Sequence, residues 1–171
     1  GNATAMLLPT DAFINSFPNG DRRKEWGIKN GYTNAKNRQI VKRTYYNKFI
    51  NEQFFETEIS PSTAAISLDY TMPIIRAAEM YLIAAEAENE INGPTAAAYS
   101  YINAIRQRAR IDKNDPTHVP NLSGLSKDVF RTAVLNERKW ELFIEGQAWF
   151  DLKRTKTFNL VQLARGSKMA I

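Results

Sequence analysis

The second half of the chain carries carboxylates at a spacing that could serve hydrolysis. Glu137, Glu141 and Glu145 follow at four-residue intervals, and Arg138 stands among them. Two carboxylates can cleave a glycosidic bond, one as general acid and one as nucleophile or base, and Glu141 and Glu145 would be that pair. However, both belong to one expected helix without an evident cleft. Nearby arginine also lowers a carboxylate's pKa, whereas a general acid needs a raised one. We therefore predict no catalytic residue.

The same charged residues have a structural interpretation. They stand in alanine-rich or apolar segments, where guanidinium and carboxylate groups can pair bidentately between packed helices. Partly buried pairs of this kind specify how helices fit together more than they add stability. We predict an interhelical lattice of ion pairs made of Arg76, Glu79, Glu86, Arg106, Arg108, Glu137, Arg138, Glu141, Glu145, Asp151 and Arg154.

Other reactive chemistry finds no support among the residue types. The chain has no cysteine, which excludes disulfides, thiol nucleophiles and cysteine-ligated metals. Its one histidine, His118, lies in a proline-flanked stretch and is expected on a surface loop. The sequence shows no phosphate-binding glycine loop, nucleophile elbow or calcium loop. We expect no metal site and no cofactor.

Charge and hydropathy exclude two further classes of protein. The formal net charge is +5, but the basic residues are mixed with acids instead of forming a stripe. A nucleic-acid binder usually shows such a stripe within a recognisable module, so we expect no nucleic-acid partner. No run of 18 apolar residues predicts a spanning helix, and residues 1–5 lack the features of a signal peptide.

The helices that must position the charged residues are predicted after residue 72. Residues 1–72 are interrupted by proline and Asn-Gly positions, which predicts a loop-rich segment with a short strand over 43–49. From Pro73 onward, apolar spacing and helix breakers predict helices over 74–91, 95–110, 126–145 and 147–155. The predicted domains are thus a loop-rich segment, 1–72, and a helical region, 73–171.

The first two helices should pack antiparallel because the connection at Asn92-Gly93-Pro94 is so short. Their predicted apolar faces comprise Ile75, Ala78, Leu82 and Ala85 on one helix, and Ala98, Tyr101 or Ile102, Ile105 and Ala109 on the other. Trp140 and Trp149 are expected in the core. The predicted fold class is mainly α, with antiparallel helix pairs like those of a tetratricopeptide α–α superhelix and a long irregular segment.

Three blocks of this sequence resemble the SusD/RagB family. They run over 75–87 (IRAAEMYLIAAEA), 101–109 (YINAIRQRA) and 137–154 (ERKWELFIEGQAWFDLKR). The blocks stand in the family's order with similar spacing. The resemblance covers 73–156 closely and 1–72 loosely, where Gly20-Asp21-Arg22-Arg23 is similar to a short upstream motif. Lys139 and Ala148 depart from the family pattern, in which arginine is usual at both positions.

The resemblance implies a nutrient-binding protein without catalysis. Family members lie on the outward face of the outer membrane, held there by a lipid anchor. They pass oligosaccharides, or in some branches peptides, to a TonB-dependent transporter of the SusC type. Members are also longer and carry an anchoring cysteine that this chain lacks, so we expect the chain to be part of a longer protein.

Ligand recognition is expected in the loop-rich segment. Sugar rings present apolar faces, which suit aromatic side chains that have polar neighbours. The candidates, each close in sequence to asparagines, are Trp26, Tyr32, Tyr45 and Tyr46. Each could instead pack the loops against the helices. Two other functions stay open at this point, a helix-repeat scaffold that binds protein alone and a glycosidase that uses Glu141 and Glu145.

Overall fold

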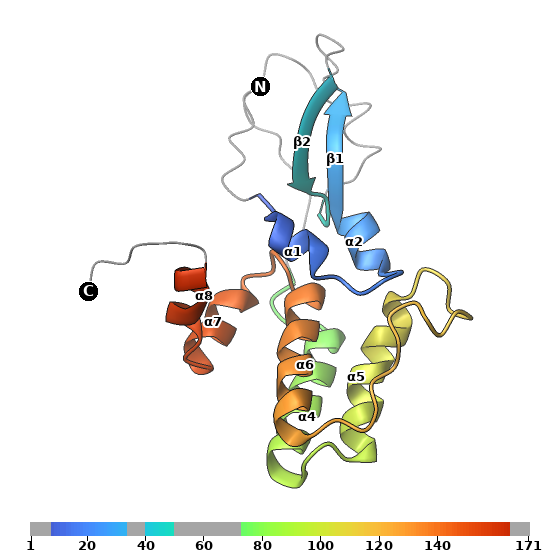
Figure 1. The fold of residues 1–171 in the computed structure, drawn as a ribbon, viewed down its shortest axis with the longest axis vertical. Helices are drawn as coiled ribbons and strands as arrows, with labels where there is room; N and C mark the ends of the chain where they lie inside the picture. Colours follow the sequence, from blue (N-terminus) through green and yellow to red (C-terminus); the bar gives the residue numbers. More distant parts are fainter. Residues whose placement is uncertain (1–7, 34–39, 50–72, 165–171) are drawn as a thin grey trace. The chain divides into compact units, whose positions relative to one another are not determined.

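The computed structural model describes residues 8–33, 40–49 and 73–164. Within these ranges the elements are α1 (Asp11–Asn15), α2 (Arg22–Gly27), β1 (Ile28–Thr33), β2 (Ile40–Tyr46), α4 (Ala77–Asn92), α5 (Ala96–Ala109), α6 (Lys127–Glu141), α7 (Gln147–Arg154) and α8 (Phe158–Ala164) (Figure 1). The predicted mainly helical fold class is confirmed. None of the helices in the described ranges is both long and apolar enough to cross a bilayer.

The fold divides into two compact units, which we describe separately. The first contains the described parts of 1–72 together with 107–120, and the second contains 73–106 and the described residues from 121 onward. The first unit therefore includes a segment that follows α4 in the sequence.

Two short helices and a hairpin form the first unit. Thr10 caps α1 by accepting a hydrogen bond from the backbone N–H of Phe13, and Asp21 caps α2 by accepting one from the N–H of Arg23. Strands β1 and β2 pair antiparallel. The sequence prediction missed α1, α2 and β1, and it placed β2 three residues too late. Helices of five and six residues are too short to repeat the 3.6-residue apolar spacing, so their caps are the only local signals of them.

The segment 107–120 is bound to the residues that precede α2. The N–H of Ile111 donates to the carbonyl of Gly20 over 3.0 Å, and the N–H of Val119 donates to that of Asn19 over 2.9 Å. Gly20 has φ +64°, and a Cβ there would lie 2.2 Å from Cγ of His118. His118 lies on the loop as expected, but it is half-buried. Its imidazole therefore approaches the backbone at position 20 so closely that only glycine fits.

The core of the second unit lies between α4, α5 and α6. Its buried residues are Ala78, Leu82, Ala85, Ala98, Ile102, Ile105, Phe130 and Val134. Of the two alternatives on α5, Ile102 is buried and Tyr101 is exposed. The prediction for Ile75 was wrong: its side chain is exposed, because α4 begins at Ala77 with Arg76 as its N-cap.

Polar contacts fix the connections between these helices. Gly93, with φ +83°, ends α4 as expected, and α5 begins three residues later. Asn103 holds the next connector on α5, since its amide donates to the carbonyl of Leu122 and its oxygen accepts from the N–H of Leu122. The hydroxyl of Tyr99 accepts a hydrogen bond from Leu125. Ser126 then caps α6.

Two expectations about the last predicted helices were wrong. Helix α6 ends at Glu141 rather than near Gly146, so Glu145 lies in the turn before α7. Ile144 in that turn has φ +57°, a conformation outside the right-handed helix. Trp149 is half-exposed instead of buried, with its ring 5.0 Å from that of Phe158. Trp140 is partly buried.

Candidate functional site

The first cluster of charged residues joins the start of α4 to the end of α6. Arg76 donates to Glu141 Oε1 over 2.6 Å and to both carboxylate oxygens of Glu145 over 2.8 Å. It also donates over 2.6 Å to the backbone carbonyl of Glu141, the last residue of α6. Burial lowers the pKa of Arg76, but hydrogen bonds and charge from Glu145 and Glu141 outweigh this and raise it above its usual value.

The second cluster contains a buried ion pair inside the unit. Arg106 Nη1 on α5 lies 2.6 Å from Glu137 Oε2 on α6, and the Glu137 side chain has no exposed surface. The pair crosses between two helices that also share the apolar core. At this depth the effective dielectric constant is low, so each charge depends on its partner.

The third cluster joins α4, α6 and α7. Asp151 accepts from Arg138 Nε over 2.8 Å and from Arg154 Nε over 2.8 Å. Arg138 also reaches Glu79 over 3.5 Å, and Arg154 forms a bidentate pair with Glu86. Arg108, the remaining residue of the predicted lattice, is exposed on the part of α5 that belongs to the first unit.

These contacts bear directly on the hydrolytic alternative. Both carboxylates of the hypothetical pair, Glu141 and Glu145, are hydrogen-bonded to the same guanidinium. A general acid must hold a proton, and a nucleophile must face a substrate. Carboxylates that share one arginine are engaged in holding that arginine in place. The geometry therefore suits an ion pair that holds the start of α4 against the end of α6 better than it suits acid–base chemistry.

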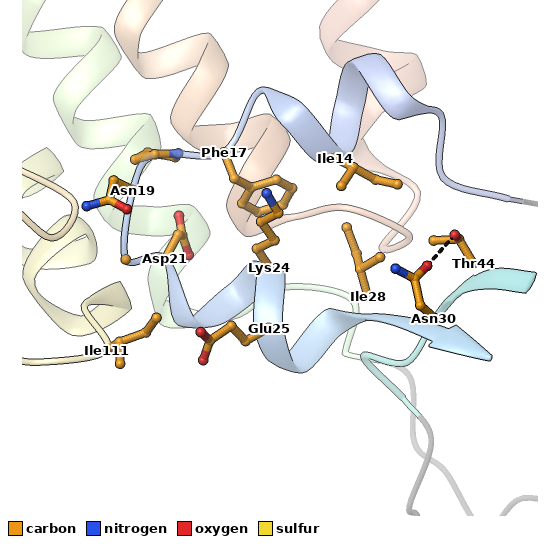
Figure 2. Close-up of a pocket in the computed structure, with 12 residues that line it drawn as sticks. Ile14, Phe17, Asn19, Asp21, Lys24, Glu25, Ile28, Asn30, Thr44 and Ile111 are labelled. Carbon is orange, nitrogen blue, oxygen red and sulfur yellow. Dashed lines mark hydrogen bonds between the residues drawn. The ribbon is translucent and has the colours of Figure 1, made fainter. Parts of the chain in front are cut away.

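A pocket of about 580 Å³ opens in the first unit, between α1, α2 and the start of β1 (Figure 2). Its lining combines apolar with polar residues. The apolar residues are Ile14, Phe17, Pro18, Ile28 and Ile111. The polar residues are Asn19, Asp21, Lys24, Glu25, Asn30 and Thr44, and the twelfth lining residue is Gly20. A cleft with apolar walls and a few polar groups is the usual form of a small-molecule site. We call it the α1–α2 pocket.

Alternation along the hairpin decides which strand residues reach this pocket. Ile28 pairs with Tyr46 and Asn30 with Thr44, so these four side chains share one face of the hairpin. Asn30 and Thr44 are joined by a side-chain hydrogen bond, drawn in Figure 2. Lys29 and Tyr45 point to the opposite face.

The four predicted ligand-binding aromatics do not form one cluster around the pocket. Trp26 on α2 is 73% exposed, but it is not among the lining residues. Tyr46 lies on the pocket face of the hairpin, with its ring 6.2 Å from that of Phe13, while Tyr45 lies on the other face. Tyr32 belongs to β1, and its side chain lies outside the described residues.

Sequence reasoning missed the α1–α2 pocket. Its polar groups come from the caps and first turns of short helices, and Ile111 comes from a segment about ninety positions further along. The only local signals were the caps, Thr10 before α1 and Asp21 before α2. Nothing local indicates that Ile111 returns to α2.

Comparison with known proteins gives a single consistent family. A family model described as "SusD family" matches residues 10–170. SusD-like protein P25 of Formosa agariphila is 33% identical over 153 residues, which is 90% of this chain and 26% of that protein.

Solved structures share the fold. A SusD superfamily protein from Parabacteroides distasonis superposes with a TM-score of 0.63 at 24% identity, over 86% of this chain and 31% of that one. A SusD-like carbohydrate binding protein from Bacteroides vulgatus gives 0.58 at 24% identity, over 87% and 27%. The chain thus spans only about a quarter to a third of the length of these relatives.

Proposed function

This chain belongs to the SusD family, and we propose that it forms part of a protein that binds nutrient oligosaccharides without transforming them. The B. vulgatus structure with the same fold is described as a carbohydrate binding protein. The relatives are several times longer, so the proposal assigns this chain a share of the binding surface.

The observation that carries the proposal is the exposed indole of Trp26. It is 73% exposed on α2, the helix that also supplies Lys24 and Glu25 to the α1–α2 pocket. Covering a large exposed aromatic side chain with an apolar ring face lowers the free energy of the complex. Pyranose rings offer such a face. The pocket adds amide and hydroxyl groups that match sugar hydroxyls.

The remaining elements of the proposal follow from family membership. We propose that Tyr32, Tyr45 and Tyr46 add contacts to ligand. We also propose that the whole protein is held by a lipid anchor on the outer membrane, facing outward. There it would deliver its ligand to a SusC-like TonB-dependent transporter. The pairing of Glu141 and Glu145 with one arginine favours a role without catalysis.

One observation favours a second function, that of a protein-interaction scaffold. On α4, Met80, Ile83 and Ile91 lie along a face opposite to the core residues and are exposed by 53%, 45% and 78%. Phe150 of α7 is exposed and lines a groove together with Ile83. Exposed apolar side chains of this kind suit contact with another polypeptide. Absence of any glycan binding would favour this alternative.

A glycan array probed with the 171-residue chain tests the proposal, and isothermal titration then measures the best ligand. Trp26→Ala should weaken binding roughly 2- to 10-fold, the range expected when one aromatic contact is lost. Trp149→Ala is the matched control, because it removes another exposed indole, on α7, and should leave affinity unchanged. Equal affinity of parent and Trp26→Ala would remove Trp26 from the site, and binding to no glycan would refute the proposal.

A further inference from the structure

Three charged residues line the α1–α2 pocket, and one of them, Asp21, already forms an ion pair. The carboxylate of Asp21 is fully buried and already paired with Arg23, whose Nη2 lies 2.6 Å away and whose Nε donates over 2.9 Å. Its second function, capping α2, uses the same carboxylate. Asp21 therefore offers little negative charge to a ligand. Lys24 and Glu25 are the other charged residues of the lining.

Lys24 and Glu25 differ in position. The Lys24 side chain is half-buried, whereas Glu25 is exposed. In Figure 2 the Lys24 and Glu25 side chains leave α2 in opposite directions, with Lys24 on the side of α1. Within the part of the chain that the structure describes, the Lys24 ammonium takes part in no ion pair or side-chain hydrogen bond. A half-buried charge interacts more strongly than an exposed one, because solvent screens it less.

We propose that the α1–α2 pocket selects oligosaccharides that bear anionic groups, uronic carboxylates or sulfate esters, and that Lys24 recognises the charge. This rests on the carbohydrate binding proposed above. The ammonium would pair with the anionic group, while Asn30 and Thr44 bond neighbouring hydroxyls. Ile14 and Phe17 line the pocket against the ring face. A flexible lysine is a point charge that adapts to either kind of anion. The net charge of +5 would also attract such a ligand.

A matched pair of ligands isolates the charge. An oligogalacturonate and its carboxyl-reduced product have the same length and linkages, and they differ in one carboxylate per residue replaced by a primary alcohol. A sulfated galactan oligosaccharide of equal length distinguishes sulfate from carboxylate recognition. Titration of the 171-residue chain should show roughly ten-fold tighter binding of at least one anionic ligand than of the reduced one, as expected for a charge-assisted contact.

Three variants decide whether Lys24 is the recognising group. Lys24→Gln should abolish the preference for the anionic ligand while it leaves affinity for the reduced ligand unchanged. Lys24→Arg should keep the preference. Lys113→Gln removes an equal charge from the exposed loop of the same unit and should have no effect. Circular dichroism confirms that each variant is folded.

The outcomes separate this inference from the function on which it rests. A parent chain that binds the reduced ligand as tightly as the anionic ones overturns charge selection but keeps carbohydrate binding. A preference that survives in Lys24→Gln overturns the role of Lys24. Binding of neither neutral nor anionic sugars overturns the proposed function itself.

Discussion

Replacement of Glu137 by alanine probes the most deeply buried ion pair of the helical unit. In the parent, Glu137 has no exposed surface and Arg106 is 5% exposed, with 2.6 Å between Oε2 and Nη1. Glu137→Ala leaves the Arg106 guanidinium in the interior without this partner. Breaking a buried pair on one side costs about 3–5 kcal/mol. For a chain of this length, that corresponds to a fall in melting temperature of roughly 6–20 °C.

Thermal unfolding followed by circular dichroism measures the effect, and denaturant titration gives the free energy of unfolding. The double variant Arg106→Leu/Glu137→Leu should recover most of the loss, because it removes both charges and leaves apolar side chains in their place. Glu90→Ala serves as the surface control. Glu90 pairs with Arg131 between α4 and α6, but both side chains are well exposed, so its removal should barely change the melting curve. If Glu137→Ala melts within a degree of the parent, the argument from burial is wrong.

Two further predictions concern other contacts of the fold. Glu145→Ala should lower the melting temperature by less than Glu137→Ala, because the partly exposed Arg76 keeps Glu141 as a partner at 2.6 Å; a loss as large as that of Glu137→Ala, or no loss at all, would contradict this. Gly20→Ala should destabilise the first unit by at least ~1–2 kcal/mol, the cost of a left-handed conformation for alanine, and the clash with His118 adds to it. The double variant Gly20→Ala/His118→Ala should remove the clash but keep the cost of the left-handed conformation. Hydrogen exchange at the amides of Ile111 and Val119 measures the loss of local stability. Full protection of both amides in Gly20→Ala would refute the close approach.

The helical unit was largely predictable because its signals are local. Leu82, Ala85 and Ile105 are buried, as the 3.6-residue spacing of apolar side chains indicates. Breakers such as Asn92-Gly93 stop helices through backbone preferences of a few residues. These features need no knowledge of distant parts of the chain.

The errors arose where a distant contact decides the local structure. Helix α6 has no breaker before Gly146, yet it ends at Glu141, whose carbonyl accepts a hydrogen bond from Arg76. Arg76 lies 65 positions earlier in the sequence, so no local sequence pattern predicts that α6 ends at Glu141. Trp149 stands in an apolar run, but the surface that would cover its ring is only partly supplied by Phe158.

The sequence by itself determined the mainly helical fold class, most of the core positions and the family, because periodicity and motif order are properties of the chain alone. The sequence also identified the charged residues of the helices as candidates for interhelical ion pairs. Only the tertiary structure decided which carboxylate meets which guanidinium, and that residues 107–120 return to the turn before α2. It alone assembled the α1–α2 pocket with Lys24 inside. Such contacts join residues far apart in sequence, and their free energy depends on distance and burial, which only a folded chain defines.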